Sequence, residues 1–63
     1  HIRVVVEMQR AAHAWADTAT AEFAAGYLTA LTWWQKHVNL FTTNVHYYRR
    51  QALIEKFPHL AKL

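Results

Sequence analysis

The residues of this sequence best suited to chemistry are its five histidines. His13 and Asp17 lie four positions apart, so on a helix they share one face and offer two ligands to a metal ion. Two ligands do not complete a site, and the sequence has no Cys, no Glu-x-x-His and no His-x-x-x-His to supply others. We therefore expect a hydrogen-bonding role for His13 at the surface, and no metal site.

Two further histidines lie in the C-terminal half of the chain. His37 stands among aromatic residues, where an imidazole can serve as an axial haem ligand, but a polar residue at a helix interface is the simpler interpretation. His46 falls among polar positions and is expected to face water. The sequence also has no serine and no pair of carboxylates in a glycosidase-like context. We expect no enzymatic activity and no cofactor.

The segment 47–50, Tyr-Tyr-Arg-Arg, combines aromatic rings with arginines as nucleic-acid-binding surfaces do. A strand before it would place Arg3, Val5 and Glu7 toward bases, as in a ribbon-helix-helix module. On a helix, however, the two tyrosines fall in apolar columns and the arginines fall outside them, facing water. Nucleic-acid binding is therefore the alternative to protein contact.

An apolar pattern runs through residues 31–54. A first column is spaced by three and four positions and includes Leu31, Trp34, Val38, Phe41, Val45, Tyr48 and Ala52. A second column recurs every seven positions, about 100° from the first, and consists of Trp33, Leu40, Tyr47 and Ile54. Such spacing is typical of a helix that packs against neighbours on two sides. Apart from Ala52, we expect these residues to form the contact interface.

The phase of this pattern continues through 41–44, although threonine and asparagine are poor helix formers. The sequence therefore predicts an all-α protein with one long amphipathic helix over about 18–57, ended by Pro58 and capped by Asp17 or Thr18. The alternative is a helical hairpin that turns near 39–44.

Residues 1–9 alternate between apolar and polar side chains, which predicts a short extended arm. The same segment also fits helical spacing, so a helix is the alternative. The expected organisation is a single small domain with an arm over 1–9, a helical part over 10–57 and a tail over 58–63.

Charge is distributed unevenly along the 63 residues, whose formal net charge is +3. Residues 1–22 carry two basic and three acidic side chains, residues 23–35 carry none, and residues 36–63 carry five basic and one acidic. This asymmetry is typical of some small membrane subunits, although the uncharged segment is shorter than the roughly 20 residues of a membrane span. A helix partly inside a bilayer and shielded by other subunits is therefore kept as an option.

A long helix with two apolar columns cannot cover its own surface. We therefore expect a non-catalytic accessory or structural subunit that packs in a larger assembly of proteins, with membrane association as an option. The alternatives are a self-associating helical bundle, including one of designed origin, and the nucleic-acid-binding module.

Overall fold

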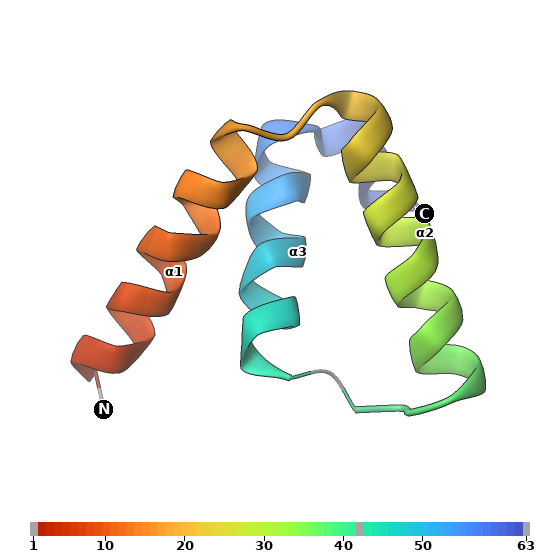
Figure 1. The fold of residues 1–63 in the computed structure, drawn as a ribbon, viewed down its shortest axis with the longest axis horizontal. Helices are drawn as coiled ribbons and strands as arrows, with labels where there is room; N and C mark the ends of the chain where they lie inside the picture. The colour runs from red at the N-terminus through yellow and green to blue at the C-terminus, as the bar shows by residue number, and fades with distance from the viewer. Residues whose placement is uncertain (1, 42, 63) are drawn as a thin grey trace.

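The computed structural model describes residues 2–41 and 43–62, and this part of the chain is helical without strands (Figure 1). Helices α1 (Ile2–Asp17), α2 (Ala21–His37) and α3 (Asn44–Lys56) precede the short 3-10 helix η1 (Pro58–Lys62). In Figure 1, α1 and α2 diverge from their connection, with α3 between them. The all-α prediction is confirmed.

Two predictions about the elements are wrong. Two interruptions separate the helices. The first, between α1 and α2, lies near residue 18, where the predicted helix begins. The second, between α2 and α3, breaks the predicted single long helix over 18–57 at the turn near 39–44 that was the alternative. The extended arm over 1–9 is also wrong, because its described residues belong to α1. A lone strand would have lacked a neighbour to pair with, whereas a helix satisfies its backbone within itself.

Threonine side chains explain the first interruption. The Thr18 hydroxyl donates to the Trp15 carbonyl over 2.8 Å, and the Thr20 hydroxyl accepts from the Phe23 N–H over 3.1 Å. Such side-chain bonds to the backbone compete with continued helix. Thr20, rather than Asp17 or Thr18, is therefore the N-cap of α2, and Glu22 lies in the first turn, where a carboxylate suits the helix dipole.

The second interruption has the same cause. The Asn39 side-chain oxygen accepts from the Phe41 N–H over 3.0 Å, and the Thr43 hydroxyl accepts from the His46 N–H over 3.4 Å. The first bond is a local turn and the second caps α3. The chain therefore leaves one helix and enters the next within a few residues.

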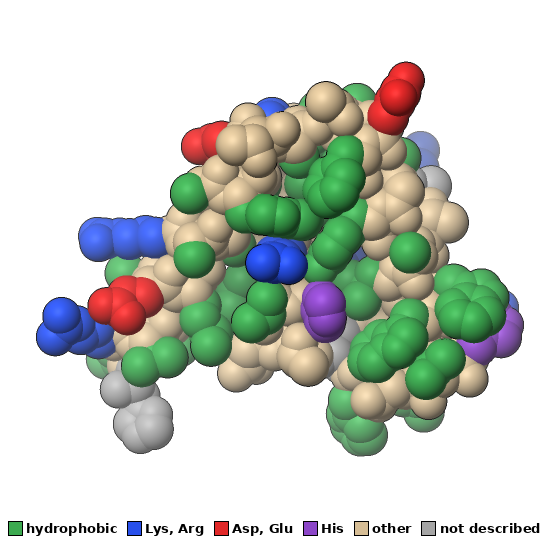
Figure 2. All heavy atoms as spheres, in the orientation of Figure 1, with side chains coloured by type: hydrophobic (Ala, Val, Ile, Leu, Met, Phe, Trp, Pro, Cys, Tyr) green, Lys and Arg blue, Asp and Glu red, His purple; other side chains and the backbone are tan. Residues whose placement is uncertain are grey.

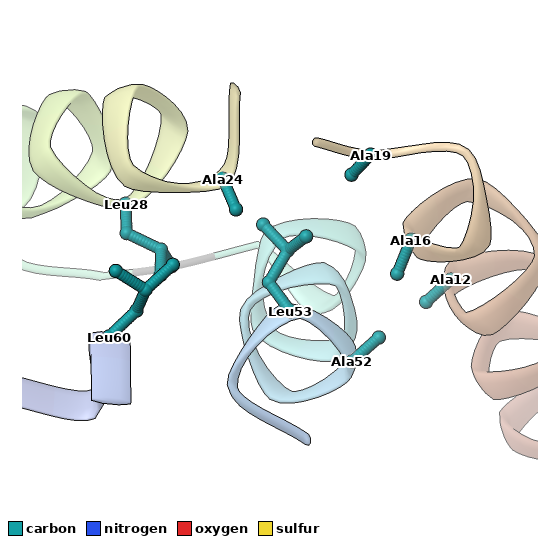
Figure 3. Packing of buried hydrophobic residues seen from close by; sticks show 8 residues of the cluster. All are labelled: Ala12, Ala16, Ala19, Ala24, Leu28, Ala52, Leu53 and Leu60. Carbon is teal, nitrogen blue, oxygen red and sulfur yellow. The ribbon is translucent and has the colours of Figure 1, made fainter. Parts of the chain in front are cut away.

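The core is built from small side chains contributed by all the helices (Figure 3). Leu53 of α3 is its one fully buried large side chain, with Leu28 and Leu60 on one side and alanines of α1 on the other. Alanines let the helix backbones approach closely. The cluster consists of Ala12, Ala16, Ala19, Ala24, Leu28, Ala52, Leu53 and Leu60.

Lys56, the last residue of α3, ties this helix to the end of α1. Its ammonium donates to the carbonyls of Ala16, Asp17 and Ala19 over 3.0, 2.9 and 2.9 Å. The last carbonyls of a helix lack partners within the helix and carry partial negative charge. One lysine therefore donates to three carbonyls where the chain turns from α1 toward α2, and the Ala16 carbonyl among them also accepts from the Ala19 N–H.

Substitution of Lys56 by methionine should lower the free energy of unfolding by about 1–2 kcal/mol, because charge-assisted hydrogen bonds to partly solvated carbonyls are lost. The matched control is Lys62→Met in η1, because the Lys62 ammonium makes no hydrogen bond to any other residue that the structure describes. Thermal unfolding followed by circular dichroism measures both. Equal shifts of Tm would show that the Lys56 contacts contribute nothing.

Candidate functional site

The structure divides the ten predicted interface residues into two groups. Leu31 is buried, and Trp34, Tyr48 and Ile54 are half-buried. The other six are exposed, namely Trp33, Val38, Leu40, Phe41, Val45 and Tyr47. Because the chain turns between α2 and α3, the two apolar columns do not lie along one continuous helix. Their residues are divided between α2, the connection and α3.

Aromatic side chains join the three helices on one face of the molecule. Trp15 of α1 lies edge-on to Tyr27 of α2, with ring centroids 5.0 Å apart, and edge-on to Phe23 at 5.7 Å. The Arg49 guanidinium of α3 lies 4.7 Å from the centroid of the Trp15 ring. Edge-on rings and a cation over an indole are both favourable arrangements. We call this surface the aromatic face; it consists of Trp15, Phe23, Tyr27, Trp34, His46 and Arg49.

His46 joins α2 to α3 within the aromatic face. It is half-buried, and its Nδ1 lies 2.8 Å from the Tyr27 hydroxyl. Its ring is 6.2 Å from that of Trp34. The expectation that His46 faces water is therefore wrong, because the turn before α3 brings it against α2. Figure 2 shows hydrophobic side chains gathered between α1 and α2, around a basic and a histidine side chain.

Two hollows flank α3 on this face. One lies against α1 with a volume of about 210 Å³, and its lining includes Met8, Ala11, Ala12, Val45 and Arg49. The other lies against α2 with about 280 Å³, and its lining includes Tyr27, Ala30, Leu31, Trp34 and His46. Pockets for cofactors and drug-sized ligands are usually larger, from about 300 to 1,000 Å³. These hollows are of a size to accept single side chains from a partner.

Arg49 lies at the centre of the aromatic face and is half-buried. Among the described residues, Arg3 pairs with Glu7 at 3.4 Å and His13 with Glu55 at 2.9 Å. Within residues 2–41 and 43–62, no carboxylate pairs with Arg49. The sequence pattern placed Arg49 on a water-facing side, and only the packing of α3 against α1 shows its position over Trp15.

His13 pairs with Glu55 of α3 rather than with Asp17. Its Nε2 lies 2.9 Å from a Glu55 carboxylate oxygen and its Nδ1 lies 2.8 Å from the Gln9 carbonyl. Both nitrogens donate together only when the ring is protonated. The hydrogen bond to Glu55, followed by that to Gln9, therefore raises the pKa of His13 above its usual 6.5. In the described residues, no three His, Asp or Glu side chains gather as metal ligands.

This pairing makes stability depend on pH. Because the pKa of His13 is raised in the folded state, its contribution is complete below the unfolded pKa of 6.5 and is lost as the pH rises through the folded pKa. Between about pH 5 and 8.5, the Tm advantage of the wild type over Glu55→Gln should shrink. Glu22→Gln, an exposed change on α2, should leave the pH profile unchanged. Parallel profiles for wild type and Glu55→Gln would contradict the pairing.

The remaining candidates lie apart from the aromatic face. His37 is exposed, its Nδ1 lies 3.0 Å from the Trp33 carbonyl, and its ring stacks on that of Trp33 at 4.9 Å. Tyr47 and Tyr48 are edge-on to one another at 5.2 Å, and Tyr48 packs against the core. The ribbon of the nucleic-acid alternative is missing, because residues 2–9 are helical.

Within the described residues, every helix is too short or too polar to traverse a bilayer. Comparison of the chain with protein-family models, with curated proteins and with solved structures finds no match. The geometry of the aromatic face is therefore the basis for assigning a function.

Proposed function

We propose that this chain is a non-catalytic helical subunit that packs through its aromatic face against helices of another protein chain, in a larger assembly. The observation that carries the proposal is the composition of the core. The buried residues are alanines and leucines, and none of the nine aromatic side chains, all of which are described, is buried. Five of these side chains are half-buried, and four of them pack against the core from outside. Large aromatic side chains dominate the energetics of interfaces, so the ring surface that stays exposed favours contact with a partner.

The shape of the molecule supports the same conclusion. Its Cα atoms extend over 31 × 26 × 15 Å, which is a flat layer of helices. Its accessible surface is 4811 Å², whereas a compact monomer of this mass exposes about 4,200 Å². The excess of about 600 Å² means that this chain is less compact than a monomer of its mass usually is. Domains usually consist of at least two packed layers, and here the partner would supply the second.

The aromatic face also indicates the chemistry of the partner. Its two hollows suit apolar side chains, and Arg49 between them suits a carboxylate, which guanidinium groups bind with two parallel hydrogen bonds. The sequence has no Asp or Glu from residue 23 to residue 54, so a carboxylate meets no repulsion from this stretch of the chain. An amphipathic helix with an acidic residue in its apolar stripe fits these features.

Sedimentation velocity of the purified chain over micromolar to submillimolar concentrations tests for self-association. A photo-cross-linking amino acid at position 30, which is exposed and lines the hollow against α2, tests for a different partner in extracts of the source cells. Position 32 is exposed on the same helix outside that hollow and is the matched control. A chain that stays monomeric and gives the same cross-links from both positions would overturn the proposal.

A further inference from the structure

The end of the molecule at the α2–α3 loop carries a second set of exposed apolar side chains. Val38, Leu40 and Phe41 are 63%, 80% and 81% exposed, and Trp33 in the last turns of α2 is also exposed. In Figure 1 this loop lies at the opposite end from the α1–α2 connection. We call these four residues the apolar tip.

Trp33 of the apolar tip borders an open hollow along α2 with Ala25, Gly26, Thr29 and Ala30. The other three residues of the tip lie in the loop that follows α2. Val38, Leu40 and Phe41 line neither of the hollows of the aromatic face. A protruding loop needs a surface that can deform around it, and a fluid lipid layer does so without a preformed cavity. Exposed leucine and phenylalanine also gain free energy by leaving water for acyl chains, as they do when buried in protein.

The basic side chains next to the tip favour anionic over neutral lipid headgroups. Lys36 and His37 occupy the last turn of α2, directly before the tip. No acidic residue occurs from residue 23 to residue 54, so no carboxylate near the tip in sequence offsets the positive charge of Lys36. Basic side chains next to a membrane surface are attracted by anionic headgroups, and tryptophan concentrates at the headgroup level.

We propose that the apolar tip inserts reversibly into the surface of an anionic membrane. Leu40 and Phe41 enter the acyl region, while Trp33 and Lys36 lie among the headgroups. This is the arrangement of a peripheral anchor, which combines apolar insertion with electrostatic attraction. The inference does not depend on the proposed function, because the tip and the aromatic face share no residue.

Co-sedimentation of the full chain with vesicles tests this proposal. Binding should be stronger to vesicles with about 30% phosphatidylserine in phosphatidylcholine than to phosphatidylcholine alone, and it should weaken with added salt. Phe41→Asp should reduce partitioning about tenfold or more, because a large apolar group is replaced by a charge that anionic lipid repels. Circular dichroism should show that this exposed loop substitution leaves the helices folded, which separates lost binding from lost folding.

Ile2→Asp is the matched control, because Ile2 is 83% exposed at the start of α1 and the substitution makes the same change in net charge. It should retain most of the vesicle binding. Absence of binding at millimolar lipid would overturn the proposal, as would an equal loss in both variants, which would indicate bulk charge alone. Loss of protein association in Phe41→Asp without vesicle binding by the wild type would assign the tip to a protein partner instead.

Discussion

Replacement of Leu53 by alanine should remove the cooperative unfolding transition of this protein at room temperature. Leu53 is 0% exposed and lies where α1, α2, α3 and η1 meet in the core. A buried Leu→Ala substitution costs about 3–5 kcal/mol, and a core in a domain of this size rarely contributes more than about 3–5 kcal/mol in total. The neighbouring side chains are mostly alanines, which are too short to fill the cavity. The substitution therefore removes most or all of the net stability.

Thermal and urea unfolding, followed by circular dichroism, measure this effect. Leu40→Ala is the matched control, because it makes the same chemical change at a side chain that is 80% exposed. It should leave Tm within a few degrees of the wild type. A Leu53→Ala protein that melts cooperatively near the wild-type Tm would show that the core is not centred on this residue.

Replacement of Val45 by aspartate should abolish association through the aromatic face while the chain stays folded. Val45 is 45% exposed, lines the hollow against α1 and lies in the first turn of α3. An acidic residue in a first turn suits the helix dipole, and α3 has none there, so the helix itself gains from the change. At a desolvated contact, the new charge and the lost apolar area should weaken binding by about 30-fold or more.

Asn44→Asp is the control for this substitution. It places the same charge one position earlier in α3, at an exposed residue that lines neither hollow. Analytical sedimentation, or the yield of cross-links from position 30, compares the two variants with the wild type. Equal association of Val45→Asp and wild type would remove the aromatic face as the contact surface.

Part of this fold could be predicted from the sequence because helical spacing is a local property. Within α2 the first column is buried at Leu31, and Leu28, which lies outside the column, is also buried. Within α3 the column reaches the core at Ala52. Four of the ten predicted interface residues are buried or half-buried, whereas Leu53, the most buried residue of α3, belongs to neither column.

The continuity between these helices could not be predicted from the spacing. Trp34 and Val45 are eleven positions apart, close to the roughly 10.8 residues of three helical turns. The connection between α2 and α3 therefore keeps the helical spacing between Trp34 and Val45 in the sequence, although the chain reverses direction between them. The side chains of Asn39 and Thr43 favour a turn over a continued helix, because each accepts a hydrogen bond from a backbone N–H group.

The sequence by itself determined that this chain is helical, that it has more apolar surface than one helix can cover, and that its basic charge lies toward the C-terminus. Only the tertiary structure decided which side chains meet. His13 and Glu55 are 42 positions apart, and Lys56 reaches carbonyls up to 40 positions away. Periodicity reports which side of a helix a residue occupies, whereas such pairs depend on how separate helices are placed against one another. The aromatic face exists for the same reason, since no single helix carries it.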